Sequence, residues 1–535
     1  MSITSLSFIV FLFALLAAFF VLPEKCRWPL LLAASMFFYI YSGGITVVYI
    51  IATSILVYIA TLFIQKTSEK NKAYLKEHKA ELDREQKKAF KQKSKKQKRA
   101  ILIAAIIGVL AFLIVFKYSR FLIEQANHVI GLFSAFTFNN EFSLIIPLGI
   151  SYYTLMAIGY MADVYWGKIK AEKNYLKVLL FISFFPHITQ GPISDFGQLS
   201  GELFKEHHFS YDNFSRGFQR MLWGFFKKMV IADALSPYVT QITGHFEQYT
   251  GITCIMGALL YMAQLYADFS GYMDIMCGYC EMLDIQLAEN FNRPYFSKSL
   301  SELWRRWHIT LGAWLRTYVY YPIAMAKWNQ NLSQKCKKPL GEYASGKIAA
   351  TVPLLFVWFV IGIWHDASWA YIGWGFGNAF VIILSEWLAP VYAGVKKKLH
   401  IRETAFFYRA FQVVRTFFVF TLLEIVAAVF AAGDNGFSYI KRAVTNYSLP
   451  HSLEELFPSV EGLGGQFLIM LLLALAGVGL MFIFSLLQRK KPIRDYFNKI
   501  PMFVRIVIMA AAVVLIIAFG VQASWGAGAF MYANF

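Results

Sequence analysis

The sequence has 535 residues, of which 58% are hydrophobic and only 16% are charged, and its formal net charge at neutral pH is +19. A soluble domain of this length needs more polar surface, so the composition excludes an ordinary soluble protein and indicates an integral membrane protein. The positive charge lies mainly in connections between apolar runs, which is typical of cytoplasmic loops and argues against a nucleic-acid-binding face.

The apolar runs are candidates for membrane-spanning helices, each of which needs about 20 residues. The first run, residues 1–22, has no basic leader and no small-residue cleavage site, so we interpret it as a retained span. The clear candidates are residues 5–22, 46–64, 100–116, 142–162, 252–283, 348–362, 369–388, 406–431, 467–487 and 502–521. With the shorter run at residues 28–41, the sequence predicts an all-α polytopic membrane protein with about eleven transmembrane helices.

The connections carry the orientation signal. The longest, residues 65–99, holds 14 Lys and Arg against 5 Asp and Glu, which predicts a cytoplasmic loop that is solvated or lies on lipid. The other basic connections are residues 25–27, 168–177, 327–347, 396–402 and 489–499. Placing them on the same side puts both ends of the chain outside the cytoplasm. The multi-pass pattern therefore predicts a multi-pass protein of a cell membrane.

Two segments do not follow the regular pattern of spans. Residues 184–193 interrupt an apolar stretch with two prolines and a glycine, and broken backbone at membrane depth survives where protein buries it or where it lines a cavity. Residues 301–318 are amphipathic and too charged to span, so they are predicted to lie in the interface or to dip into the protein. Irregular elements among regular spans suggest an enclosed reaction chamber.

Two histidines lie in such settings. His365 follows Trp364 in the apolar run VIGIWHDASWAYIGWGF, at a break between two spans. An ionisable side chain in hydrocarbon costs a few kcal/mol or more, so it marks a functional site unless it is a hydrogen-bonded core residue. Asp366 is next in the chain; it either holds a tautomer of His365 or is an acid at the N-terminus of the following helix.

His308 lies in the run LWRRWHITLGAWLR. If this run is one helix, His308 shares a face with Trp304 and Arg305, because residues three and four apart are neighbours. His308 is then predicted to face inward with a cation beside it. The alternative is an interfacial helix anchored by Trp and Arg, in which His308 is only hydrogen-bonded.

A larger set of motifs matches a known family from Pro147 to Gly377. The matching residues are Pro147–Thr154, Asp163–Tyr165, Phe185, Pro186, Gly191–Ile193, Gly224, Lys227, Lys228, Asp233, Tyr266–Tyr272, Asp274, Glu289–Tyr295, Trp304–Ile309, Trp314–Arg316 and Gly362–His365. On these residues the sequence resembles the membrane-bound O-acyltransferases, in particular the branch of bacterial alginate O-acetyltransferases. The resemblance implies that fold, with re-entrant and interfacial helices around a central pore.

The resemblance also implies roles for the two histidines. His365 corresponds to the family's essential histidine and His308 to its second motif histidine, and both are expected in a pore that receives acyl donor from the cytoplasmic side and acceptor from the opposite side. Relatives usually have Gly where this chain has Asp366 and often Asp where it has Thr317. These departures put the local geometry in doubt and remove neither histidine.

The chemistry of acyl transfer assigns further candidates. Transfer from a thioester to a hydroxyl needs a base, and neutral imidazole suits that role, so His365 is the candidate base. The oxyanion needs preorganised donors. The available types are Asn290, Asn292, Arg293 and Arg305.

Five further residues have weaker interpretations. Asp268 could contact substrate by lining the pore, or with Asp274 could bind a cation; ligands from one helix make a metal site unlikely, so none is predicted. Cys277 and Cys280 have redox-pair spacing without its strand–helix context, which favours simple packing. Glu424 is predicted to have an internal pairing partner, with Arg415 as one possibility.

We expect a single integral membrane domain over residues 1–535. Within it, residues 1–140 hold N-terminal spans and the basic loop 65–99, residues 141–390 the motif-bearing catalytic core, and residues 391–535 the C-terminal spans. No internal repeat or separable soluble domain is evident.

By resemblance, the function is an O-acyltransferase that moves an acyl group, acetyl in the first place, from a cytoplasmic thioester such as acetyl-coenzyme A for O-acetylation of an extracytoplasmic polysaccharide. An extracytoplasmic esterase-like acetyltransferase is the expected partner, and no cofactor beyond the donor is expected. The alternatives are D-alanylation of teichoic acid from a carrier protein, O-acetylation of peptidoglycan, and, from a different class, a transporter or polysaccharide exporter.

Overall fold

The computed structural model describes residues 2–79, 81–133, 136–139, 144–448, 452–457 and 467–520, which are helical apart from connections and one isolated β-bridge. These residues form two compact units. Unit 1 comprises residues 10–210 and 283–287, and unit 2 comprises residues 2–9, 211–282 and 288–520 of the described chain. The predicted division at residues 140 and 390 stays a prediction.

Unit 1 is built from helices of the first two fifths of the chain. Helix α1 (Leu6–Val21) is divided between the two units. The remaining helices of unit 1 are α2 (Glu24–Gly43), η1 (Gly44–Thr46), α3 (Val47–Glu77), α4 (Arg84–Leu113), η2 (Ile114–Tyr118), α5 (Ser119–Gly131), α6 (Ile150–Trp166), α7 (Tyr175–Ser183), α8 (Phe185–Ile188) and α9 (Phe196–Leu203).

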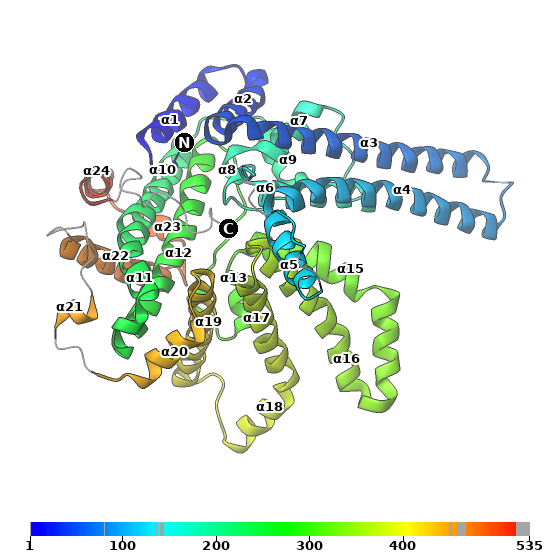
Figure 1. Cartoon of the computed structure of the whole chain (residues 1–535). Helices are drawn as coiled ribbons and strands as arrows, with labels where there is room; N and C mark the ends of the chain where they lie inside the picture. Colours follow the sequence, from blue (N-terminus) through cyan, green and yellow to red (C-terminus); the bar gives the residue numbers. More distant parts are fainter. Residues whose placement is uncertain are drawn as a thin grey trace. The chain divides into compact units, whose positions relative to one another are not determined.

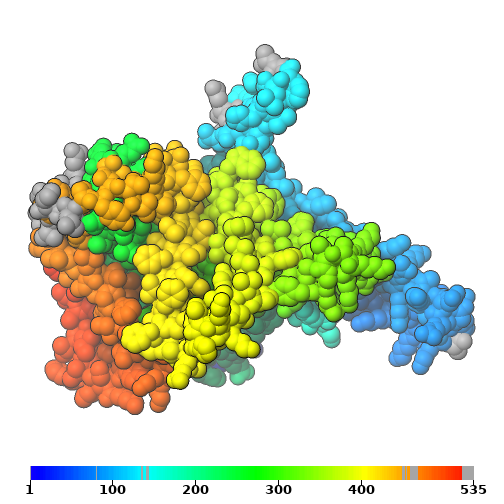
Figure 2. Space-filling view, turned by 90° about the horizontal axis from the view of Figure 1, so that it is seen from below, coloured from blue at the N-terminus to red at the C-terminus, as the bar shows by residue number. Residues whose placement is uncertain are grey.

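The basic loop predicted at residues 65–99 is helical almost throughout. It consists of the end of α3, a short turn and the start of α4, which begins with a capping box in which Asp83 and Gln86 satisfy each other's backbone N–H groups. The two helices lie side by side, and their joined ends stand away from the remainder of unit 1 (Figures 1 and 2). Most of the charged residues at these ends are exposed, and whether they face solvent or lipid stays a prediction.

The interruption predicted at residues 184–193 is confirmed. Helix α7 ends at Ser183, α8 makes a single turn, and an irregular stretch leads to α9. Protein buries this break, including His187 and Gln190. Gly149, at φ +69°, starts α6 against it: a Cβ on Gly149 would lie 2.0 Å from the carbonyl oxygen of Ile188. Only glycine permits this approach.

Unit 2 contains the longer helices and both predicted histidines. Its helices are α10 (Tyr211–Phe225), η3 (Phe226–Ala232), α11 (Asp233–Gly244), η4 (Phe246–Gln248), α12 (Gly251–Met282), η5 (Pro294–Phe296), α13 (Leu300–Arg306), α14 (Ile309–Leu315), η6 (Arg316–Tyr320), α15 (Tyr321–Ala324), α16 (Lys327–His365), α17 (Trp369–Trp387), α18 (Ala389–Lys398), α19 (Phe406–Ala431), α20 (Gly436–Thr445), α21 (Leu453–Leu456), α22 (Phe467–Leu487), α23 (Ile493–Phe497) and α24 (Met502–Phe519).

Among the described residues, seven helices are long and apolar enough to cross a membrane, or eight if the bent pair α17–α18 is one span. The sequence predicted about eleven. The difference arises because α2 and α3 join into one helical stretch, Glu24–Glu77, and because α1 and α6 have only 16 and 17 residues. Residues 142, 143 and 521 of the predicted spans lie outside the described residues. The chain is an all-α, multi-pass membrane protein.

Glycines allow helices of unit 2 to approach closely. Helices α16 and α17 lie side by side (Figure 1). A Cβ on Gly362 of α16 would lie 2.6 Å from the carbonyl oxygen of Tyr371, and one on Gly375 of α17 would lie 2.4 Å from that of Trp358. Small residues at such contacts let helix backbones pack without a hydrophobic driving force. This contact fixes the end of α16, where His365 lies.

We predict that Gly375→Val separates α16 from α17 and lowers the free energy of unfolding by about 1–3 kcal/mol, because the added side chain meets backbone. Gly373→Val is the matched control, since nothing lies within 4 Å of a Cβ at that position of the same helix. Thermal unfolding of the detergent-solubilised protein measures both. Equal melting temperatures for the two variants would contradict the packing argument.

Candidate active site

The predicted helix through His308 is broken at that residue, so the single-helix expectation is wrong. Helix α13 ends at Arg306, Trp307 is extended, and α14 begins at Ile309. His308 itself has φ 46° and ψ 52°, the left-handed conformation that non-glycine residues rarely adopt. The face shared with Trp304 and Arg305 therefore does not exist in the form predicted, and Arg305 is exposed.

A segment distant in sequence imposes this break. Residues 290–292 pair with residues 306–309 in an antiparallel bridge: the N–H of Asn292 donates to the carbonyl of Arg306 at 2.9 Å. The N–H of Ile309 in turn donates to the carbonyl of Asn290 at 3.1 Å. This isolated bridge thus interrupts the helical backbone at His308.

The Asn290 side chain secures the same turn. Its Oδ1 accepts from the backbone N–H of Thr310 at 3.0 Å and from the Thr310 hydroxyl at 2.6 Å, and the side chain is buried. It acts as an N-cap for α14 supplied from outside that helix. The predicted role of Asn290 in the oxyanion site stays a prediction, and its visible role is to hold the backbone of His308.

The imidazole of His308 is buried with only 3% of its surface exposed, against the ring of Phe269 at 4.9 Å and that of Trp364 at 6.0 Å. Neither ring nitrogen has a hydrogen-bond partner among the described residues. Burial lowers the pKa of His308, so the ring is neutral at ordinary pH. A buried polar group without a protein partner is uncommon and calls for an explanation, such as a catalytic role, a bound water or an ion.

His365 is the last residue of α16 and is 4% exposed. Its ring packs edge-on against Trp364 and Trp374, both at 5.1 Å, and parallel to Tyr371 at 5.9 Å. The predicted break after His365 is confirmed, because Asp366 is extended and α17 begins at Trp369, capped by Ser368. Asp366 is thus a residue of the α16 C-terminus and not an N-terminal acid of α17.

The structure brings the two predicted histidines together around Trp364. The indole of Trp364 lies 6.0 Å from the ring of His308 and 5.1 Å from that of His365. The residues come from different elements, the α13–α14 break and the end of α16. Sequence reasoning had placed both inside the protein and could not place them beside each other.

A cluster of three further tryptophans supports this arrangement. Trp304 of α13, Trp358 of α16 and Trp374 of α17 have ring centroids 5.0 to 5.9 Å apart, each pair edge-to-face. The Trp304 indole N–H donates to Asn378 Oδ1 at 3.0 Å. Edge-to-face contacts and a satisfied N–H give this cluster a fixed geometry.

Glu424 belongs to the same cluster. Its buried carboxylate accepts from the indole N–H of Trp374 at 3.0 Å, and Arg415 instead donates to the backbone carbonyl of Lys298 at 3.4 Å. The suggested pairing of Glu424 with Arg415 is therefore wrong, while the prediction of an internal partner is confirmed. Because Trp374 also packs against His365, Glu424 holds one of the rings that surround this histidine.

Asp268 is engaged in a buried ion triad. Lys228 donates to Asp268 and to Asp233, both at 2.7 Å, and all three side chains are buried. Asp274 pairs with Lys227 at 2.7 Å and with Arg220 at 2.9 Å. These lysines were quoted in the sequence only as family residues, and helix pairing of α10 and η3 with α12 explains them. A contact of Asp268 with substrate stays a prediction.

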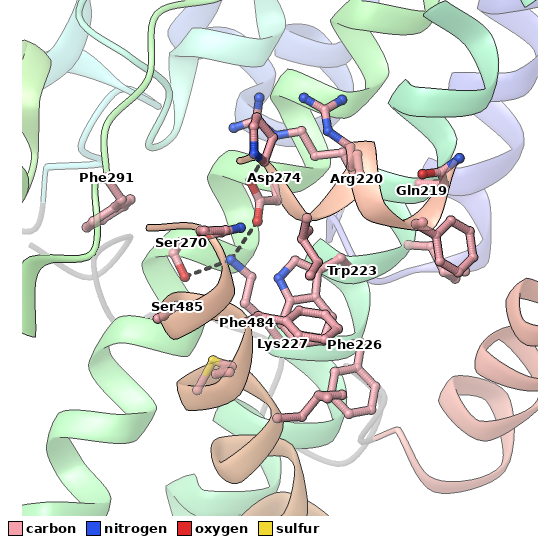
Figure 3. Close-up of a pocket in the computed structure, with 18 of the residues that line it drawn as sticks. Gln219, Arg220, Trp223, Phe226, Lys227, Ser270, Asp274, Phe291, Phe484 and Ser485 are labelled. Carbon is pink, nitrogen blue, oxygen red and sulfur yellow. Dashed lines mark hydrogen bonds and ion pairs between the residues drawn. The ribbon is translucent and has the colours of Figure 1, made fainter. Parts of the chain in front are cut away.

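Asn292 and Arg293 line a cavity to which α10, η3, α12, α22 and α24 of unit 2 also contribute; Figure 3 shows part of its lining. Asn290 lines the same cavity, whereas His308 and His365 do not. Their predicted contact with the oxyanion, and that of the exposed Arg305, stay predictions.

Two buried side chains of unit 1 were not singled out from the sequence. His187 and Gln190, in and after α8, have no hydrogen-bond partner for any side-chain nitrogen or oxygen among the described residues. Burial lowers the pKa of His187, so it too is neutral. The available signal was a histidine enclosed by Pro186 and Gly191 within the predicted break.

Comparison with known proteins shows which family and which relatives the chain is similar to. Residues 170–336 match the model of the MBOAT, membrane-bound O-acyltransferase family. A protein named probable alginate O-acetylase AlgI from Azotobacter vinelandii is 35% identical over 274 residues, covering 51% of each chain. A peptidoglycan O-acetyltransferase from Helicobacter pylori is 30% identical over 336 residues, which cover 57% of this chain and 58% of that protein.

A more distant match is the teichoic acid D-alanyltransferase of Bacillus subtilis, 28% identical over 251 residues that cover 45% of this chain and 59% of that protein. The chain spans about half the length of the curated relatives it matches. The fold defines a helical multi-pass membrane protein with a buried pair of histidines. Over part of its length the chain is similar to the membrane-bound O-acyltransferase family and, within it, to proteins named as alginate O-acetylases.

We predict that Asn290→Ala lowers the free energy of unfolding by about 1–3 kcal/mol, because the N–H and hydroxyl of Thr310 lose their acceptor in a buried site. Asn292→Ala is the matched control, since Asn292 is exposed two residues along the same segment. Thermal unfolding in detergent measures both variants. A melting temperature for Asn290→Ala equal to that of Asn292→Ala would refute the capping role.

Proposed function

We propose that this protein is an O-acyltransferase in which His365 is the general base. The observation that carries the proposal is the buried imidazole of His365 at the end of α16, which Trp364, Trp374 and Tyr371 enclose. Part of the chain also matches the model of this family. Such a site excludes water, which would otherwise hydrolyse an activated ester. The family assignment argues against the alternative of a transporter or exporter.

The reaction is the transfer of an acyl group from a thioester to a hydroxyl. His365 takes the proton of the acceptor hydroxyl while the hydroxyl oxygen forms a bond to the acyl carbon. The tetrahedral oxyanion then collapses, the carbon–sulfur bond breaks, and the thiolate leaves and takes up the proton. The thioester supplies the activation, so the proposal needs no cofactor and no metal.

His308 is proposed to contact the reacting substrates. Its two ring nitrogens are without protein partners among the described residues and its ring is neutral, so it can accept one hydrogen bond and donate another. The ring of Trp364 packs against the rings of both His308 and His365. His308 is assigned to substrate contact and His365 to proton transfer. Asn290, Asn292, Arg293 and Arg305 remain the proposed candidates for oxyanion donors.

The proposed cargo is an acetyl group and the proposed acceptor an extracytoplasmic polysaccharide. The support is the name of the relative from Azotobacter vinelandii, an alginate O-acetylase. Acetyl-coenzyme A, or another acyl thioester, is the proposed donor, and an extracytoplasmic esterase-like acetyltransferase is the proposed partner. The names of the two other relatives leave peptidoglycan O-acetylation and teichoic acid D-alanylation as alternatives.

Surface esters distinguish these acceptors. In a deletion strain complemented with the gene, mass analysis of exopolysaccharide, peptidoglycan and teichoic acid should find acetyl esters restored on exopolysaccharide. Restoration on peptidoglycan alone, or of D-alanyl esters on teichoic acid, would overturn the proposed cargo and acceptor.

We predict that His365→Ala reduces acyl transfer by about 10²- to 10⁴-fold, the usual contribution of a general base. His245→Ala is the control, because that histidine is exposed in the same unit. Transfer is measured as polysaccharide acetylation in cells with protein abundance matched by immunoblot. Normal acetylation with His365→Ala would remove His365 from the role of base.

A second prediction concerns the wall of the His365 pocket. Glu424→Leu deprives the Trp374 indole of its acceptor, whereas Glu424→Gln retains a carbonyl oxygen there, so transfer should fall several-fold more in the leucine variant. The same acetylation assay, with melting temperatures recorded in parallel, compares the two. Equal activity at equal stability would show that Glu424 does not position the site.

A further inference from the structure

A second site of unit 2 lies away from the histidines. It is a cavity of about 740 Å³ between α10 and η3 on one side and α22 and α24 on the other. Most of its depth is apolar, and Figure 3 shows Trp223, Phe226 and Phe484 along this part. The lining from α24 comprises Ile508, Met509, Ala511, Ala512 and Leu515.

The other end of the cavity is cationic. Arg293, Lys490 and Lys491 line it, and within the described part of the chain none of these three forms an ion pair. Lys490 and Lys491 are exposed just beyond the last residue of α22. Unpaired cations at the end of an apolar cavity are favourable only if an anion or solvent accompanies them.

The acidic residues of the cavity do not neutralise these cations, because other bases already hold them. Arg220 forms two hydrogen bonds to Glu289, at 2.7 and 2.6 Å. Lys227 points between Ser270 and Asp274, as Figure 3 shows, at 2.8 and 2.7 Å. Arg494, which also lines the cavity, pairs with Glu281. The net positive charge is therefore left at the mouth, on the three unpaired residues.

We propose that this cavity binds an anionic phospholipid, with its phosphate at Arg293, Lys490 and Lys491 and an acyl chain along α22 and α24. Arginine and lysine are the side chains that recognise phosphate, and basic pockets at the cytoplasmic ends of membrane helices bind anionic head groups. The basic connection that holds these two lysines is among those predicted to be cytoplasmic.

The apolar lining favours a lipid over a soluble phosphate compound. Inorganic phosphate would leave the apolar depth unfilled. Helix α24 is almost wholly exposed, with 6% of its span buried, so its surroundings are the membrane from which a lipid enters. Neither His308 nor His365 lines the cavity, whereas the candidate oxyanion donors Asn290, Asn292 and Arg293 do. A lipid phosphate at Arg293 would exclude that side chain from the oxyanion role of the proposed transfer.

Binding is tested on the full chain in detergent by native mass spectrometry, with phosphatidylglycerol as the probe. Phosphatidylcholine with the same chains, coenzyme A and inorganic phosphate are titrated in parallel. We expect phosphatidylglycerol to bind at least tenfold more tightly than the other three. Equal binding of phosphatidylcholine overturns the proposal, and so does coenzyme A or phosphate binding that displaces phosphatidylglycerol.

The cationic end is tested with Lys490→Gln/Lys491→Gln, which should weaken phosphatidylglycerol binding roughly 10- to 30-fold. The matched control is Lys397→Gln/Lys398→Gln, which removes two consecutive exposed lysines from the end of α18. Equal affinity in the two double variants would overturn the assignment of the head group.

The apolar part is tested with Ala512→Trp, which fills the cavity from α24 and should weaken binding at least tenfold. Ala510→Trp makes the same change on an exposed position of that helix that does not line the cavity. Melting temperatures recorded with each variant identify misfolding. Unchanged binding by stable Ala512→Trp protein would place the lipid elsewhere.

Discussion

The edge-to-face packing of Trp304, Trp358 and Trp374 is the interaction on which the candidate active site depends. It joins α13 to α16 and α17, which are themselves connected by only three residues. Indole rings contribute large contact areas, and their N–H groups must find acceptors when buried, so Asn378 and Glu424 fix the orientation as well as the position of two of them. The histidines are then placed by what surrounds them and need no rigid loop of their own.

Backbone geometry provides the second support. Close glycine contacts set the distance between α16 and α17, while the bridge between residues 290–292 and 306–309 converts a helical sequence into a turn. Both features position side chains by restricting the backbone, without hydrogen bonds between those side chains. The buried ion triad of Lys228 with Asp233 and Asp268 likewise connects η3, α11 and α12.

The sequence predicted the helical membrane class, the break at residues 184–193 and the end of α16 at His365, because apolar length and helix-breaking residues are local signals. It did not predict the break at His308. The run LWRRWHITLGAWLR has helical periodicity, and the partner that opens it, at residues 290–292, is visible only in three dimensions. The Glu424 partner was missed for a related reason: a search for opposite charge overlooks an indole N–H as donor. The predicted roles of Asn292, Arg293 and Arg305 rest on residue type alone. Residue type does not determine whether a side chain can contact the oxyanion.

The left-handed conformation of His308 has a consequence for how this position can vary through evolution. A β-branched residue there would pay for a disfavoured backbone in addition to losing the ring, whereas asparagine and glycine tolerate the conformation. Substitutions at this site are therefore constrained both by the chemistry of the side chain and by the backbone conformation that it must adopt. A histidine within a continuous helix would be constrained by its chemistry alone.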